Sequence, residues 1–406
     1  MSATAKSTPL RSTARLSSAE ARGARIVHLT SVHPTFDVRI FHKECRSIAR
    51  AGYDVTLICT HDRDEIVEGV RVKAVSRASG RFFRMFCTTR AILKQAIRED
   101  ADLYHFHDPE LIPAALLLRL RKKKVVYDVH ENVPADVSAK HYIPRLLRRP
   151  VAWLAGLIEK AASQQFSAVV PATREIAHRF ESRTAQAVLV RNYPSVDDIS
   201  VAPSWSQRSA SVVYAGLLSP DRCIKEILQA LELIPSAIDA RTIFAGPFSP
   251  RTYADEIAGM PGQDRAKFLG TIDRFAVSRL YDGGRAGLCL CRPTLGYLES
   301  APTKIFEYMQ AGIPVIASDF PAFRAIVNTA RCGLLVDPLD PGAIAGAIEY
   351  ILTHATEAEQ MGWRGREAAR QTFNWTSEES KLLALYARLL DSHSMASASP
   401  RQGNSE

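Results

Sequence analysis

The feature that most constrains the fold of this chain is a series of short apolar runs, each followed by a stretch with helical periodicity. The first run is Arg25–Thr30, and the stretch after it places Phe41, Cys45 and Ile48 on one helical face before Gly52. Runs that are apolar at nearly every position are typical of strands covered on both faces in a parallel sheet. The first half of the chain therefore predicts a βαβ series with strands at residues 25–30, 55–59, 103–106, 125–129 and 168–170.

A second series of the same kind follows a segment that is rich in Asp, Ser and Pro and has no periodicity. Two such series predict an α/β protein with two Rossmann-like, doubly wound domains. The strands of the second series are expected at residues 211–215, 242–245, 287–291, 315–317 and 333–336. The predicted organisation is a disordered tail (1–22), an N-terminal domain (23–195), a linker (196–210), a C-terminal domain (211–375), a helix (376–392) and a second disordered tail (393–406).

Composition limits the compartment and the chemistry. With 406 residues, 46% of them hydrophobic, the chain is long enough to bury two cores. No apolar run approaches the ~20 residues of a membrane-spanning helix, and the N-terminus lacks the apolar stretch of a secretory signal, so we expect a cytoplasmic protein. The seven cysteines form no C-x-x-C pair, and those in apolar runs are expected to be reduced and buried (Cys45, Cys59, Cys289 and Cys291).

The net charge of +9 favours an anionic partner. A nucleic acid is not expected, because no sheet face interleaves arginines with aromatic residues. Residues 143–154 combine Arg145, Arg148 and Arg149 with Leu and Trp, and residues 81–86 repeat the combination, as in segments that bind anionic lipid headgroups. We therefore predict peripheral contact with the inner face of the cell membrane. A core-facing helix with a solvated basic face is an equal alternative.

Polar segments follow the apolar runs, at the carboxyl ends where open α/β sheets bind their ligands. The longest is residues 292–312, in which Lys304 and Glu307 share one face of a helix that ends at Gly312. A loop that enters a helix beside a lysine can hold a phosphate, and Arg222 follows another strand from which it could reach the same anion. The plain alternative is an exposed ion pair between Lys304 and Glu307 worth ~0.3 kcal/mol.

Several of these segments resemble a known family. Glu299 and Glu307, with seven residues between them, together with KIFEYMQAGIPVIASDFP, resemble the E-x7-E region of retaining glycosyltransferases of the GT-B fold, in particular the large family 4. SVHPTFDVRIFHKE, HFHDPEL and YDVHE look like one branch of that family, and GLLVDPLDP resembles its closing strand. The similarity covers residues 25 to 390.

The resemblance implies that the two domains face a cleft, with a nucleotide-sugar donor on the C-terminal side and an acceptor on the N-terminal side. A final helix would cross back onto the first domain. A hexose-type sugar would pass, with retention, to a saccharide or lipid-linked acceptor in polysaccharide or glycolipid biosynthesis. The nucleotide sugar is a co-substrate, so neither a resident cofactor nor a metal is expected.

The same resemblance assigns roles to individual residues. Glu307 would hydrogen-bond the nucleotide ribose, and Arg222 with Lys304 would neutralise the diphosphate, near Gly216 at the end of its strand. The two expected catalytic residues are Glu299, near the transferred sugar, and His130, near the reacting centre.

The chain departs from the family pattern at two places. Cys223 stands where the family often has glycine, and His33 to Thr35 replaces the Gly-Gly turn that many members carry after the first strand. Asp37, Arg39 and His107 are therefore candidates for the acceptor or phosphate contact. An ion pair at the helix entry explains Asp37 and Arg39 equally well.

Other functions fit these residues less well. His105 and His107 resemble the start of an H-x-H-x-D-H metallohydrolase site, but Pro109 stands where the aspartate belongs, so a packed or hydrogen-bonded His105 is expected instead. No G-x-G-x-x-G follows a strand, which argues against a dehydrogenase. A GT-B sugar-nucleotide epimerase or hydrolase remains the nearest alternative, and its turnover would need no acceptor.

Overall fold

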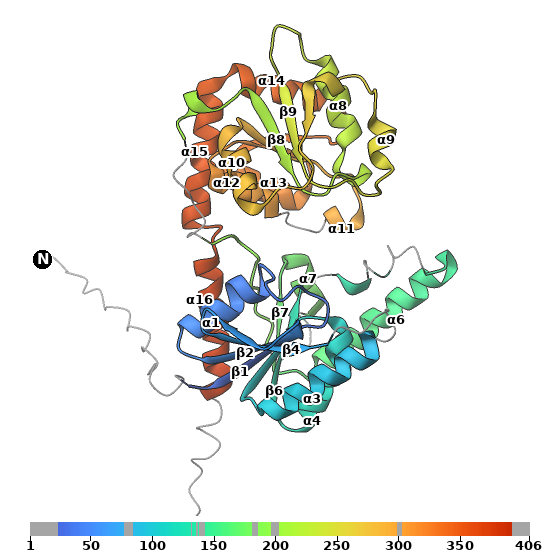
Figure 1. Cartoon of the computed structure of the whole chain (residues 1–406), viewed down its shortest axis with the longest axis vertical. Coiled ribbons are helices and arrows are strands. Elements are labelled where there is room, and N and C mark those ends of the chain that lie inside the picture. The colour runs from blue at the N-terminus through green and yellow to red at the C-terminus, as the bar shows by residue number, and fades with distance from the viewer. Residues whose placement is uncertain are drawn as a thin grey trace, which may run out of the picture. The chain divides into compact units, whose positions relative to one another are not determined.

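A computed structural model of the chain describes residues 23–76, 84–130, 132–134, 137, 143–180, 186–195, 203–298 and 303–391. It contains two sheets whose strand pairs are almost all parallel, with helices packed around each (Figure 1). Contacts between Cα atoms divide the chain into two compact units, residues 1–126 with 383–406 and residues 127–382. The α/β class expected from the sequence is confirmed, and the domain boundaries stay a prediction.

The first sheet has seven strands in the order β3-β4-β2-β1-β5-β6-β7. All five strands expected in this half are present, and β3 and β4 are additional. β3 is the edge strand and pairs antiparallel with β4, which in turn pairs parallel with β2. Both strands are only partly buried, so neither has the continuous apolar run of a strand covered on both faces. The strands are β1 Arg25–Leu29, β2 Asp54–Thr60, β3 Glu65–Val67, β4 Val70–Val75, β5 Leu103–Phe106, β6 Lys124–Val129 and β7 Ala168–Pro171.

The helical stretch expected after β1 begins with a π-helical turn, Ile40–Cys45, that continues as α1, Arg46–Arg50. Phe41, Cys45 and Ile48 are fully buried, as their spacing predicts. The other helical elements of this half are the π-helical turn Arg84–Thr88, α3 Thr89–Glu99, the 3-10 turn Pro109–Leu111, α4 Ile112–Leu120, α6 Arg145–Ser163 and α7 Arg174–Phe180.

The second sheet has six strands in the order β10-β9-β8-β11-β12-β13, with parallel pairing throughout. The five expected strands are present. The expected strand at 287–291 ends early, at Cys289, because the backbone N–H of Cys291 donates to the Ser318 hydroxyl. The strands are β8 Ser211–Ala215, β9 Arg241–Ala245, β10 Ala266–Phe268, β11 Ala286–Cys289, β12 Val315–Ser318 and β13 Gly333–Val336.

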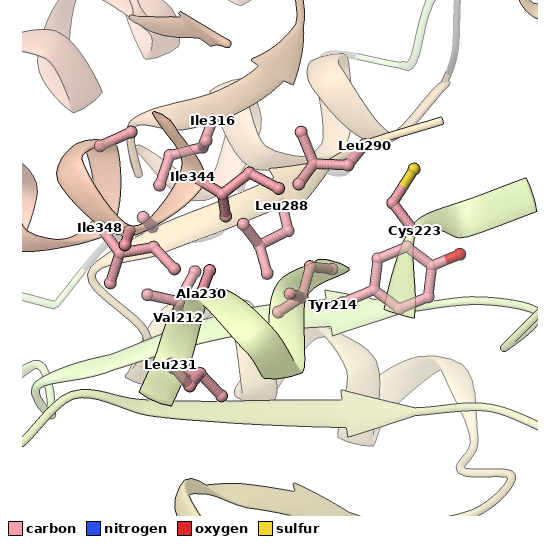
Figure 2. Close-up of a cluster of buried hydrophobic side chains, with 14 of the residues drawn as sticks. Val212, Tyr214, Cys223, Ala230, Leu231, Leu288, Leu290, Ile316, Ile344 and Ile348 are labelled. Carbon is pink, nitrogen blue, oxygen red and sulfur yellow. The ribbon is translucent and has the colours of Figure 1, made fainter. Parts of the chain in front are cut away.

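Helices cover both faces of the second sheet. Because successive strand residues point to opposite faces, alternate residues of one strand join two different cores. Val212 and Tyr214 of β8 join a core with residues of α8 and α14, part of which Figure 2 shows. Val213 and Ala215 join a second core with residues of α12 and α13. The helical elements here are the 3-10 turns Trp205–Gln207, Pro220–Arg222 and Gln263–Arg265, with α8 Ile224–Leu233, α9 Tyr253–Ile257, α10 Arg274–Gly283, α11 Leu295–Leu298, α12 Thr303–Ala311, α13 Pro321–Ala330, α14 Pro341–Thr353 and α15 Ala355–Gln371.

The last helix, α16, spans Trp375–Asp391 and buries Leu382, Leu385 and Tyr386. Its residues from Leu383 onward cluster with the first unit. Among the residues that the structure describes, no helix combines the length and the apolar character needed to cross a bilayer.

Candidate functional site

The carboxyl end of β8 and the start of α12 bring together three of the predicted donor-binding residues. Gly216 follows β8 with φ of +150°, and a Cβ built there would lie 2.8 Å from Cε and 3.1 Å from Nζ of Lys304. Lys304 Nζ lies 3.9 Å from Glu307 Oε2, one helical turn on. Glycine is therefore needed at 216 both for its backbone conformation and for the space that Lys304 takes up.

A close contact between α12 and β11 fixes where Lys304 and Glu307 lie. The ring of Tyr308 packs on Gly287, where a Cβ would come within 2.2 Å of it, and the Tyr308 hydroxyl donates to Leu288 O at 3.0 Å. Only a residue without a side chain lets the helix approach the strand this closely. The position of the lysine and carboxylate thus depends on a glycine in the neighbouring strand.

Glu307 is held by a tyrosine that the sequence analysis did not single out. Tyr281, in α10, donates its hydroxyl to Glu307 Oε2 at 2.8 Å. Burial and the adjacent carboxylate raise the pKa of Tyr281, so the phenol stays protonated and donates. This hydrogen bond fixes the orientation of the Glu307 carboxylate. Because the Glu307 side chain is 38% exposed, the carboxylate can still accept hydrogen bonds from a ligand.

Arg222 ends the 3-10 turn after β8 and is partly buried. Its Nη1 donates to the Cys291 sulfur at 3.0 Å, and its guanidinium lies 4.6 Å from the Tyr297 ring centroid. Burial disfavours its charge, but the neighbouring Cys291, Tyr214 and Tyr297 side chains raise the pKa of Arg222 overall. The site therefore keeps a fixed cation here.

Cys223 replaces the glycine common in the family without changing the backbone shape that glycine favours. Its φ and ψ of +55° and +35° are left-handed, and the residue directly precedes α8 as its N-cap. A non-glycine residue in this conformation costs about 1 kcal/mol, which the burial of its side chain in the core offsets.

Lys304 and Arg222 both influence the pKa values of two buried thiols, Cys289 and Cys291. Lys304 and Arg222 both lower the pKa of Cys289 and Cys291, although burial outweighs them and leaves both pKa values raised. Both positive charges thus lie near the carboxyl end of β11. The structure brings Gly216, Arg222, Lys304 and Glu307 to one edge of the second sheet.

His130 follows β6 and pairs with a buried carboxylate. Its Nε2 lies 2.8 Å from Oδ2 of Asp128, whose side chain is fully buried, while the His130 side chain is 15% exposed. Residues two apart on an extended segment share a face, which accounts for the contact. A carboxylate that is hydrogen-bonded to one ring nitrogen of a histidine fixes the tautomer of the ring. The second predicted catalytic residue, Glu299, lies outside the described residues.

Asp37 and Arg39 have partners within their own helix entry. Asp37 Oδ1 accepts from the backbone N–H groups of Arg39 and Ile40, at 2.8 and 2.9 Å. Arg39 is 3% exposed, and its Nε lies 3.0 Å from Oε1 of the fully buried Glu44. Glu44 is thus a partner of Arg39, and Asp37 acts as a cap at the start of the helical turn.

His107 is 2% exposed, and its Nε2 lies 2.9 Å from Nδ1 of His28. His105 is fully buried, with Nδ1 2.5 Å from the Tyr386 hydroxyl, so the expected packed, hydrogen-bonded role is confirmed. The cysteines expected to be reduced and buried are free and buried.

Asp108 holds the turn after β1 that replaces the Gly-Gly pattern. The Asp108 carboxylate accepts hydrogen bonds from the Ser31 backbone N–H at 2.6 Å and from the Thr30 hydroxyl at 2.9 Å. It also lies 2.9 Å from His33 Nδ1. Burial alone would raise the pKa of Asp108, but His33, Ser31 and Thr30 together lower it to about 2. The Asp108 carboxylate thus accepts the hydrogen bond of the Ser31 backbone N–H at this turn.

Family models match both halves of the chain. A family model described as Glycosyltransferase Family 4 matches residues 38–197, and one described as Glycosyl transferases group 1 matches residues 196–368. This chain belongs to the group 1 and family 4 glycosyltransferases. The family resemblance predicted from the sequence is confirmed.

Relatives of the glycosyltransferase include a phosphatidyl-myo-inositol mannosyltransferase of Mycobacterium leprae, 25% identical over 308 residues, which are 73% of this chain and 75% of that protein. A D-inositol 3-phosphate glycosyltransferase of Mycolicibacterium vanbaalenii is 26% identical over 197 residues, 46% of this chain and 42% of that protein.

Solved structures share the fold. Sucrose-phosphate synthase from Thermosynechococcus elongatus superposes with a TM-score of 0.72 at 20% identity, covering 91% of this chain and all of the other. HepE of Anabaena, solved in complex with UDP and glucose, gives a TM-score of 0.67 at 15% identity and covers 90% of this chain and all of the other. The glycosyltransferase has the GT-B fold with two Rossmann-like halves.

Proposed function

We propose that this glycosyltransferase moves a hexose-type sugar from a nucleotide-sugar donor to a saccharide or lipid-linked acceptor, with retention and without a divalent ion at the diphosphate. The observation that carries the proposal is the set of Arg222, Lys304 and Glu307 at one sheet edge beside Gly216. Two fixed cations and one oriented carboxylate suit a diphosphate joined to a ribose.

The cations act on the leaving group. Breaking the bond between the sugar and the diphosphate moves negative charge onto the diphosphate oxygens, and Arg222 with Lys304 stabilises that charge more strongly in the transition state than in the ground state. Glu307, oriented by Tyr281, accepts from the ribose hydroxyls. These roles together provide leaving-group stabilisation from the chain's own residues.

The catalytic roles of His130 and Glu299 belong to the same proposal. His130, held by Asp128, hydrogen-bonds the transferred sugar, and Glu299 stabilises the positive charge that develops on it. Asp37, Arg39 and His107 are proposed for the acceptor side; their intramolecular bonds favour a role in shaping the site.

An activity assay tests the proposal and separates it from the epimerase or hydrolase alternative. Purified chain is incubated with UDP-, GDP- or ADP-hexoses and candidate acceptors, without and with Mg²⁺, and both nucleotide release and product anomer are measured. We expect acceptor-dependent release with one nucleotide class, unchanged by Mg²⁺, and a product of the donor's anomeric configuration. Equal release without an acceptor would favour the hydrolase, and an inverted product would contradict retention.

We also propose that α6 binds an anionic membrane surface, where a lipid-linked acceptor would be found. The helix buries small residues, among them Ala152 and Ala162, and exposes large apolar ones, with Leu146 91% and Trp153 70% exposed. Such a face beside basic residues fits lipid headgroups and the upper acyl region. The exposed residues of α6 include Leu146, Leu147, Arg149, Val151, Trp153, Leu154, Leu157, Ile158 and Lys160.

The acceptor named in the mannosyltransferase relatives is a phospholipid, which supports this surface role. Of the second predicted segment, residues 81–83 lie outside the described residues, and Met85 and Phe86 are exposed. Sedimentation with anionic and with neutral vesicles tests the proposal. We expect binding to anionic vesicles only, lost in Leu146→Asp with Trp153→Asp but kept in Phe275→Asp, whose side chain is 80% exposed in α10. Equal binding to both vesicle types would contradict it.

A further inference from the structure

Three histidines and a glutamate lie together, buried, in the first unit, whereas the predicted donor-binding residues belong to the second. His28, Glu44 and His105 are fully buried, and His107 is 2% exposed. One ligand atom from each, an imidazole nitrogen or a carboxylate oxygen, lies within 4.8 Å of all the others. Such a set has the composition of a metal site, since neutral imidazole and carboxylate are common ligands of Zn²⁺.

Sheet geometry explains how residues far apart in sequence meet. His28 of β1 and His105 of β5 are direct partners in the parallel register, and His107, two residues beyond His105, shares its face. Glu44 comes from the π-helical turn that follows β1. The four residues therefore belong to the rigid part of this unit.

The spacing of the ligand atoms suits a single ion. His28 Nδ1 lies 2.9 Å from His107 Nε2, and each lies 4.0 Å from Glu44 Oε2. Ligand atoms of a tetrahedral zinc ion, about 2.1 Å from the metal, stand about 3.4 Å apart, within this range. The ring centroids of the three histidines are 4.8, 4.9 and 5.2 Å from one another.

The far atoms of the same side chains have partners that would orient them as ligands. His105 Nδ1 and His28 Nε2 lie 2.5 and 3.3 Å from the Tyr386 hydroxyl of α16, and Glu44 Oε1 lies 3.0 Å from Arg39 Nε. Metal-binding histidines and carboxylates characteristically carry such outer contacts, which fix ring orientation and raise ligand basicity.

We propose that His28, Glu44, His105 and His107 bind one divalent transition-metal ion, zinc by preference, as a closed structural site. Four buried protein ligands leave no open position for substrate, which distinguishes a structural from a catalytic zinc site. The ion ties β1 and β5 to the helical turn that carries Glu44, and through Tyr386 it favours docking of the end of α16. The proposal differs from the expectation, drawn from the family resemblance, that the chain holds no metal, and it is independent of the donor chemistry.

The test uses the full chain, purified without a histidine tag. We expect one metal ion per chain by elemental mass spectrometry, a lower melting temperature after chelation, and recovery of that temperature with added Zn²⁺, because an ion that binds only the folded state stabilises it. His105→Gln and Glu44→Gln should lose the ion. His61→Gln, which alters a histidine paired with Glu65 outside the cluster, should keep it. Tyr386→Phe should weaken zinc binding about 10- to 100-fold at unchanged stoichiometry.

A wild-type chain that retains no metal and gains no thermal stability from Zn²⁺ would overturn the proposal, and the cluster would then be a hydrogen-bonded network alone. Retention of the ion by both folded cluster variants would overturn it as well, because the metal would be bound elsewhere. If the variants do not fold, X-ray absorption on the wild-type zinc protein decides: three nitrogen ligands of imidazole type with one carboxylate support the site, and any sulfur ligand contradicts it.

Discussion

The turns after β1 and after β8 hold equivalent positions in the two sheets, and their contents differ. After β1, Asp108 accepts the backbone N–H of Ser31 and the hydroxyl of Thr30, so the donors at that turn face a carboxylate of the protein. After β8, Gly216 leaves room for Lys304, and the charged groups nearby are Lys304, Arg222 and Glu307.

We interpret this difference as two roles, one structural and one in donor binding. At the β1 turn, a carboxylate of the protein already accepts the available hydrogen bonds, so this turn has a structural role. At the β8 turn, two cations and a partly exposed carboxylate are suited to binding an anion of a ligand. On this account, changes at the β8 turn should mainly alter donor binding and rate. Changes at the β1 turn should mainly alter stability.

The largest expected effect is on the rate, from Arg222→Ala. We proposed that Arg222 faces the leaving diphosphate, and on that proposal its removal should lower kcat/KM about 100- to 1,000-fold. Steady-state assays with the preferred donor measure it, with Arg241→Ala, an exposed arginine paired with Asp239, as the control. A loss below about tenfold in a folded variant would mean that Arg222 does not contact the leaving group.

The next effect concerns the helix that carries Lys304 and Glu307. In Gly287→Ala the new Cβ would meet the Tyr308 ring at 2.2 Å, so the free energy of unfolding should fall by about 1–3 kcal/mol and α12 should shift. Urea denaturation and donor titration measure the two consequences. Gly283→Ala, where a Cβ has no neighbour within 4 Å, should cost nothing; an equal loss in both would contradict the packing argument.

At the β1 turn, Asp108→Asn should lower the free energy of unfolding by roughly 2 kcal/mol at pH 7, and donor affinity should not change. The pKa of Asp108 is lowered from 3.8 to about 2 in the folded chain. Its contribution is therefore complete above about pH 4 and is lost as pH falls through 2. Stability curves of wild type and variant should converge over that interval, and a constant difference would contradict the assignment.

The smallest expected effect is that of Gly216→Ala. The positive φ and the nearby Lys304 side chain both oppose a Cβ, so Lys304 must move, and donor affinity should fall about tenfold. Isothermal titration measures it. An unchanged dissociation constant would show that the position of Lys304 relative to the β8 turn does not matter for binding.

The regular elements were predictable because their signals are local. A continuous apolar run identifies a strand such as β2, and the spacing of Lys304 and Glu307 places them on one helical face. The β3 and β4 strands were missed because both are only partly buried, and charged residues interrupt their apolar positions. A local sequence pattern predicts individual helices and strands, and it carries no information on contacts between distant elements.

The contacts of the site were not predictable where they join distant elements. Tyr281 reaches Glu307 from α10, 26 residues earlier, and no spacing rule links the two. The histidine cluster shows the same limit. Only His105 and His107 are close in sequence, while the sheet register and the helical turn bring His28 and Glu44 to them.

The most direct test of the account is a thermal-shift titration of the wild-type chain with UDP-, GDP- and ADP-sugars, repeated with Lys304→Ala and Glu307→Ala. Lys225→Ala, an exposed lysine paired with Glu256, is the matched control. The account predicts stabilisation by one nucleotide class that both site variants lose and the control keeps. Equal stabilisation of all four proteins would place the donor elsewhere and contradict the assignment of this sheet edge.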